Sequence, residues 1–174
     1  MQTLLQLDLQ HNNLGPGAGS PLADALRMSS TLQSPNLYFN DLQDVGGRAM
    51  AEGLRVNTTI TTLDLSENSL EANAIQALAV ALCNNTTLRI LRLSDNEPGD
   101  GSVALARAMH VNSSLDRMKL SCCKVHAVAA EVFADALLQQ HLAHGDQPVP
   151  QQRWRARRAC AGKNDAAQHH VADG

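Results

Sequence analysis

Apolar residues recur along most of the chain with a period of 27 or 28. The starting residues Leu4, Leu32, Ile60, Leu88 and Leu115 lie 28, 28, 28 and 27 residues apart. In each unit the residues three and five places after the start are apolar, with Pro35 as the exception. Apolar residues that alternate with polar ones indicate a short β-strand with one buried face. The pattern therefore predicts five strands, one in each unit.

Each unit also carries a small polar residue eight places after its start. These residues are Asn12, Asn40, Asn68 and Asn96, followed by Cys123 in the fifth unit. A buried asparagine can bind backbone groups where a strand ends, and each such group left unpaired would cost about 1–3 kcal/mol. We expect these side chains to bind the backbone inside the core.

The second half of each unit is typical of a helix. Two large apolar residues lie four places apart and are flanked by small residues, mostly alanine, which places one apolar stripe on a helix. The pairs are Leu22 and Leu26, Met50 and Leu54, Leu78 and Leu82, Leu105 and Met109, and Phe133 and Leu137. A single unit cannot bury these residues, whereas stacked units form a continuous core. The sequence therefore predicts a stack of strand–turn–helix units.

Together these positions give the pattern L-x-x-L-x-L-x-x-[N/C]-x-L in five aligned units. Over about residues 3–141, the chain resembles leucine-rich repeat proteins of the ribonuclease-inhibitor-like class, which include the repeat arrays of NLR receptors and the Ran GTPase activators. The resemblance implies an α/β solenoid shaped as a partial horseshoe, with a parallel sheet on the concave face and helices on the convex face. It also implies that the concave face binds another protein.

We expect two regions, a repeat array over residues 1–144 and a disordered tail over residues 145–174. The tail lacks the leucines of a sixth unit and carries two prolines and a basic cluster at residues 153–158. A segment of this composition cannot bury a core. The basic cluster is either solvated without a role or a localisation signal. Because the first unit starts at a strand without a polar cap, we expect the chain to be a fragment or isoform of a longer repeat protein.

Two local features bear on this interpretation. Proline removes a hydrogen-bond donor, so Pro35 predicts that the second strand pairs most weakly. Asn-x-Ser/Thr sequons begin at Asn57, Asn84, Asn85 and Asn112, between a helix and the next strand. Asparagine tolerates the left-handed backbone that ends many helices. We therefore interpret the sequons as structural and not as glycosylation sites.

Composition and charge narrow the range of functions. A net charge of −3 disfavours a nucleic-acid partner. No charge-free apolar run approaches the roughly 20 residues that cross a bilayer, so we expect no membrane partner. The start of the chain also lacks the charged and apolar regions of a secretory signal. The four cysteines show no paired spacing, which predicts reduced thiols and a cytoplasmic or nuclear protein.

The sequence carries none of the common catalytic motifs. It has no G-x-S-x-G, no GxxxxGK[ST] and no HExxH, and its cysteines and histidines lack the spacing of zinc ligands. We predict a protein that is not an enzyme and that uses no cofactor, no metal and no small-molecule substrate. The alternative is a GTPase activator like the Ran-directed relatives, which would act by ordering its partner's catalytic residues.

Strand alternation assigns the residues between the buried positions to the concave face. Seven residues are our candidates for partner binding: Asp8, Asn36, Tyr38, Asp64, Arg92, Arg117 and Lys119. The face is acidic or neutral over the first three strands and basic over the last two. Tyr38, with Phe39 beside it, is an aromatic anchor of the kind enriched at binding hot spots. This pattern predicts a docking surface, and the alternative is a solvated face with charges placed by chance.

Overall fold

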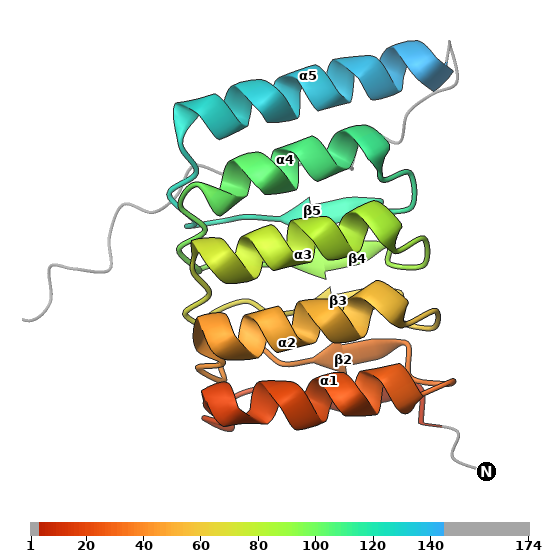
Figure 1. The fold of residues 1–174 in the computed structure, drawn as a ribbon, viewed down its shortest axis with the longest axis vertical. Helices are drawn as coiled ribbons and strands as arrows, with labels where there is room; N and C mark the ends of the chain where they lie inside the picture. The colour runs from red at the N-terminus through yellow and green to blue at the C-terminus, as the bar shows by residue number, and fades with distance from the viewer. Residues whose placement is uncertain (1–3, 145–174) are drawn as a thin grey trace, which may run out of the picture.

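The computed structural model describes residues 4–144, with side chains as far as Gln139. These residues form five strands and five α-helices that alternate along the chain (Figure 1). The strands are β1 (Gln6–Asp8), β2 (Ser34–Asn36), β3 (Thr62–Asp64), β4 (Ile90–Arg92) and β5 (Arg117–Lys119). The helices are α1 (Gly19–Met28), α2 (Gln43–Val56), α3 (Ala72–Asn84), α4 (Gly101–Val111) and α5 (Ala127–His144), and a short 3-10 helix, η1 (Pro16–Ala18), precedes α1. The predicted strand–turn–helix unit is confirmed.

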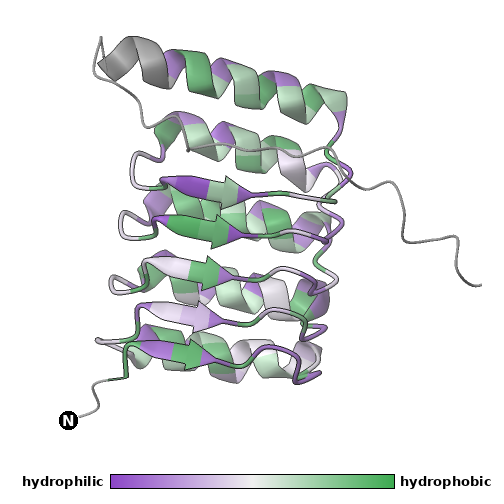
Figure 2. Cartoon of the chain, turned by 180° about the vertical axis from the view of Figure 1, so that it is seen from behind, coloured by the Kyte–Doolittle hydropathy of each residue, from purple (hydrophilic) through white to green (hydrophobic). Residues whose placement is uncertain are grey.

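The five strands form one parallel sheet in the order of the chain. The register follows the repeat, so that Leu63 pairs with Leu91, and Leu91 with Met118. The helices lie side by side over one face of the sheet (Figure 1), and the strands lie in front of them when the molecule is seen from behind (Figure 2). The predicted α/β solenoid with a parallel sheet is confirmed. We call the face without helices the open face.

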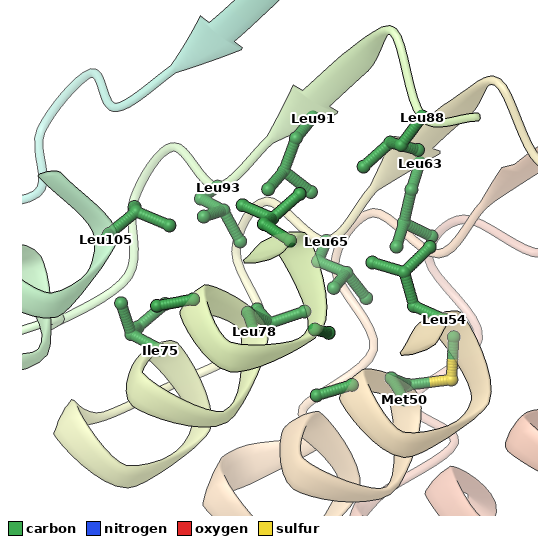
Figure 3. Close-up of a cluster of buried hydrophobic side chains, with 14 of the residues drawn as sticks. Met50, Leu54, Leu63, Leu65, Ile75, Leu78, Leu88, Leu91, Leu93 and Leu105 are labelled. Carbon is green, nitrogen blue, oxygen red and sulfur yellow. The ribbon is translucent and has the colours of Figure 1, made fainter. Parts of the chain in front are cut away.

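The core fills the space between the sheet and the helices. The strand leucines of the central units, Leu63, Leu65, Leu91 and Leu93, are fully buried. They point toward helix residues such as Leu78 (Figure 3). The outer units are less well covered. Leu7, Leu9 and Leu120 are half-buried, and Leu137, expected in the apolar stripe of the fifth helix, is exposed.

Small residues let neighbouring helices approach closely. A Cβ on Gly19 would lie 2.3 Å from Gly46 Cα, which belongs to the next helix. A Cβ on Gly101 in α4 would lie 2.6 Å from the carbonyl oxygen of Ala72 in α3. Both distances are too short for real atoms, so helix packing requires glycine at these two positions.

The asparagines at the ends of the strands bind the backbone, as predicted. Asn68 Nδ2 donates to the carbonyl oxygens of Leu37 and Ser66 at 2.8 and 3.0 Å, and its Oδ1 accepts from Leu42 N at 3.3 Å. Asn40 and Asn96 make the equivalent contacts and are also buried. Cys123 replaces them with a thiol that donates to Leu93 O at 3.1 Å. Asn12, which has no preceding unit beside it, is exposed.

A second set of asparagines joins the units at the opposite ends of the strands. Asn57, Asn85 and Asn112 are buried, and their Nδ2 atoms donate to the carbonyl oxygens of Leu26, Leu54 and Leu82 in the preceding helices. The structural interpretation of these three sequons is therefore confirmed. The expected left-handed conformation is wrong, because all three residues are extended, with φ between −82° and −73°. An extended backbone lets Oδ1 accept from the amides that open the next unit, such as Thr59 N and Ile60 N.

Pro35 weakens the sheet where the sequence predicts it. The strands β2 and β3 pair at a single position, Asn36 with Asp64, whereas each other pair of neighbouring strands is joined at three. Proline has no amide hydrogen to donate to the adjacent strand, so one rung of the ladder is lost. Two units are consequently joined to the other three by a weaker sheet connection.

The thiol prediction is confirmed for Cys83 and Cys123, which are free. It is wrong for Cys122, which is disulfide-bonded. Absence of paired spacing therefore did not exclude a disulfide at this residue. The predictions for residues 145–174, a disordered tail and a basic cluster, lie outside the described residues.

We expect the first unit to exchange its amide hydrogens faster than the central units. The amides of Leu9 and Leu65 both donate to a neighbouring strand at 2.9 Å, to Asn36 O and Arg92 O respectively. Only Leu65 is fully buried, and β3 has a strand on each side. Repeat arrays open locally from the less stable end. Slower exchange at Leu7 and Leu9 than at Leu65 and Leu93, measured by NMR, would contradict this prediction.

Candidate functional site

Five of the seven predicted site residues form one row across the open face. Asp8, Asn36, Asp64, Arg92 and Lys119 are the last residues of their strands, and each pairs in register with the next. Arg117 opens β5 and lies opposite Ile90. Tyr38 lies just beyond the end of β2. The repeat therefore brings together side chains that are far apart in the sequence, as strand alternation predicts.

The first three members of the row have a structural role. Their Oδ1 atoms accept a hydrogen bond from the backbone amide two residues later, at 3.1 Å for Asp8, 3.2 Å for Asn36 and 3.0 Å for Asp64. These bonds turn the chain away from the strand. Asn36 Nδ2 also donates to Asp8 Oδ1 at 3.0 Å, across the two strands. The amino-terminal half of the row is thus held in place by its own contacts.

The basic half of the row is less constrained. Arg92 lies 3.7 Å from the Asp64 carboxylate, so part of its charge is compensated. Arg117 and Lys119 are exposed, and neither forms an ion pair or side-chain hydrogen bond with residues 4–139, whose side chains the structure describes. The change of sign predicted along the face is therefore present, and the fifth strand carries the two uncompensated charges.

Tyr38 belongs to a cluster of three rings. Its ring centroid lies 4.9 Å from that of His11, in an edge-to-face arrangement, and Phe39 lies 4.9 Å from His11. The Tyr38 hydroxyl donates to Glu67 Oε1 at 2.7 Å. This hydrogen bond to a carboxylate raises the pKa of the Tyr38 hydroxyl, and burial and nearby carboxylates add to the effect. We call His11, Tyr38 and Phe39 the aromatic cluster.

Sequence reasoning named Tyr38 and Phe39 but missed His11. The available signal was the repeat itself, because His11 and Phe39 occupy the same place in the first and second units, seven residues after the start. Residues at one repeat position lie on neighbouring strands about 4.8 Å apart. Aligning every position of the units, and not the strand positions alone, would have placed His11 beside Phe39.

Two shallow hollows lie around Glu67 and Asp95. One, of about 360 Å³, lies on the open face and includes Tyr38, Asp64, Arg92 and Lys119 in its lining. The other, of about 500 Å³, is lined by Phe39, Glu67, Ser69, Glu71, Asp95, Asn96 and Glu97. We call the second one the rim pocket, because it lies where the strands lead into the helices. Glu67 and Asp95 line both hollows.

An exposed ion pair borders the rim pocket. Lys124 Nζ lies 2.8 Å from Glu97 Oε1, which lowers the pKa of Glu97 and raises that of Lys124. Both side chains are more than two-thirds exposed. Pairs of this kind contribute little to stability because water screens them. Lys124 therefore sets the local charge and does not hold the fold.

The described residues show neither a metal centre nor a membrane span. Among residues 4–139, whose side chains the structure describes, no group of three His, Cys, Asp or Glu side chains could hold a metal ion. None of the helices in this part of the chain has the length and apolar character needed to span a bilayer. The arrangement that the open face offers is one of charged and aromatic side chains on a rigid sheet.

Comparisons with known proteins identify the fold. A family model described as Leucine Rich repeat matches residues 1–23, 56–79 and 84–102. Leiomodin-1 actin-binding site 2 has a similar structure, with a TM-score of 0.66 and 21% identity over 77% of this chain and 79% of that one. The tropomodulin carboxy-terminal domain of Caenorhabditis elegans has a TM-score of 0.67 and 14% identity over 81% and 86% of the two chains. No curated protein matches the sequence.

Proposed function

We propose that this leucine-rich repeat protein is a non-catalytic module that binds another protein on the open face of its sheet. The observation that carries the proposal is the row from Asp8 to Lys119, in which five neighbouring strands present polar side chains in register. The leiomodin-1 domain, described as an actin-binding site, provides a precedent for a protein ligand on this fold. The ribonuclease-inhibitor-like class and a cytoplasmic or nuclear location remain parts of this proposal. The free thiols of Cys83 and Cys123 agree with that location, whereas the disulfide at Cys122 does not.

The basic end of the row favours an acidic patch on the partner. Arg92, Arg117 and Lys119 project from adjacent strands about 4.8 Å apart, and their fields add. Complementary charges mainly accelerate association, and salt weakens the effect. The partner should therefore bind more slowly as the ionic strength rises.

Removing the three basic side chains at this end of the row should slow association with the partner by about tenfold at low salt. The variant is Arg92→Ser, Arg117→Ser and Lys119→Ser, and its partner is identified by affinity capture with mass spectrometry. Surface substitutions change stability by less than about 0.5 kcal/mol each, so the fold should persist. Association rates of the purified partner at two salt concentrations give the measurement.

A matched control removes three charges from the helices. Arg48, Arg55 and Arg107 are exposed on α2 and α4, and replacing them with Ser changes the net charge equally. This control should associate within about twofold of the parent rate. A partner that binds the first variant unchanged and loses affinity for Arg153→Ser, Arg155→Ser, Arg157→Ser and Arg158→Ser would place binding in the tail.

The GTPase-activator alternative needs a separate assay. Single-turnover GTP hydrolysis by a panel of small GTPases should be unchanged by this protein, because a binding module orders no catalytic residue. Acceleration of hydrolysis would contradict the proposal and support the alternative.

A further inference from the structure

The fold imposes a left-handed backbone at one place in every unit. The residues seven places after the start have φ values of 58° for His11, 56° for Phe39, 50° for Glu67, 58° for Asp95 and 57° for Cys122. This conformation is tolerated by glycine, asparagine and aspartate and is costly for bulky residues. These residues follow the carboxyl ends of neighbouring strands and therefore form a second row along one edge of the sheet. It is the edge toward which the strand arrows point (Figure 2).

Phe39 is the one residue in that row with a large, exposed apolar side chain. A phenylalanine gains stability by burial, yet 49% of Phe39 is exposed. Its side chain also has no polar group to bind the local backbone, as aspartate has. Residues held in unfavourable conformations cluster at binding sites, and exposed aromatic side chains are enriched at binding hot spots. The Phe39 ring is therefore a candidate contact for a ligand.

The Phe39 ring contacts two other rings and lines an acidic pocket. The ring contacts His11 and Tyr38, and the Tyr38 hydroxyl donates to Glu67, in the loop that follows β3. The rim pocket beside it is lined by four carboxylates and by no basic side chain: Glu67, Glu71, Asp95 and Glu97. Glu67 binds Tyr38 and Glu97 binds Lys124. The carboxylates of Glu71 and Asp95 have no ion-pair partner in the described part of the chain.

We propose that the rim pocket receives an arginine side chain from a basic segment of the partner protein. This rests on the proposed function and adds a basic contact to the acidic patch expected at the fifth strand. Phe39 and Asp95 lie two strands apart, roughly 10 Å at the usual spacing. A guanidinium between them, above Glu67, contacts the aromatic ring with its flat face and the carboxylate with its N–H groups. Arginine suits both contacts better than lysine because its charged group is planar.

The test is an NMR titration of the full-length chain with a nine-residue glycine–serine peptide that carries three arginines. The backbone amides of Phe39, Glu67 and Asp95 should shift. The same peptide with citrulline, which keeps the shape and loses the charge, should bind at least about tenfold more weakly. The lysine version should bind about threefold more weakly. Equal binding of the arginine and citrulline peptides would overturn the proposal.

Two variants locate the contact. Phe39→Ala and Asp95→Asn should each weaken binding of the arginine peptide about three- to fivefold. Met28→Ala and Glu131→Gln, which change exposed residues of α1 and α5, should leave it within twofold. Unshifted amides in the other units show that each variant is folded. Binding that neither Phe39→Ala nor Asp95→Asn alters would overturn the proposal.

The remaining outcomes separate this proposal from its alternatives. The variant Arg92→Ser, Arg117→Ser and Lys119→Ser should still bind the arginine peptide, because its changes lie outside the rim pocket. If the proposed function fails, the partner will associate with that variant at an unchanged rate.

A variant of the tail tests whether the chain itself occupies the pocket. If the peptide binds only after Arg153, Arg155, Arg157 and Arg158 are replaced with Ser, the chain's own basic cluster competes for the pocket. That result would overturn the assignment to a partner.

Discussion

Leu65→Ala should destabilise the array by about 2–5 kcal/mol. Leu65 is fully buried and lies at the centre of the core, among leucines from β3, β4 and α3 (Figure 3). Truncating it removes apolar contacts and leaves a cavity, because the sheet on one side and the helix on the other cannot both move inward. Urea unfolding monitored by circular dichroism measures the change in the free energy of unfolding.

Leu5→Ala is the matched control for this prediction. Leu5 is 51% exposed, at the end of the sheet, so the same truncation should cost less than about 1 kcal/mol. Leu65→Met, which keeps the volume, should cost less than about 1.5 kcal/mol. A loss at Leu65→Ala no larger than that at Leu5→Ala would show that the third unit is not the centre of the core.

The fold could be predicted because each leucine recurs with the same spacing. The interval of 28 residues between Leu63 and Leu91 is both the sequence repeat and the strand register. One aligned pattern therefore fixes which strands are neighbours and which side chains face the helices. The exceptions were also informative, since the missing amide of Pro35 accounts for the weak pairing of β2 with β3.

The candidate site could be predicted in position but not in detail. Alternation placed Arg92 and Asp64 on the same face, but the contact between them depends on how far each side chain reaches along the row. The left-handed conformation predicted for Asn57 was wrong because asparagine at a helix end can act in two ways. Its amide can bind the preceding unit from an extended backbone, and this use prevailed over the left-handed turn.

The left-handed backbone conformation of Phe39 could not be predicted from the residue type alone. Phenylalanine rarely adopts positive φ, so local preference argues against the observed value of 56°. The conformation follows from its repeat position, because Glu67 and Asp95 adopt it in the next two units.

Asn96→Ala should be as damaging as the loss of a core leucine, at about 3–5 kcal/mol. Asn96 is 2% exposed. Its Nδ2 donates to Leu65 O and Leu93 O at 3.0 and 2.9 Å. Its Oδ1 accepts from Asn68 N and Leu70 N at 3.1 and 2.9 Å. Alanine would leave these backbone groups buried without partners, and each costs about 1–3 kcal/mol before the structure relaxes.

The fifth unit supplies a rescue variant for this prediction. Cys123 occupies the equivalent place, and its thiol donates to Leu93 O at 3.1 Å. Asn96→Cys should therefore recover about half of the loss, since a thiol can replace the donor to one carbonyl but accepts hydrogen bonds weakly. Asn84→Ala, at an exposed asparagine that binds its own helix, should cost less than about 0.5 kcal/mol. If Asn96→Cys were no more stable than Asn96→Ala in urea unfolding, the thiol would not replace the asparagine donor at this position, and the prediction would be contradicted.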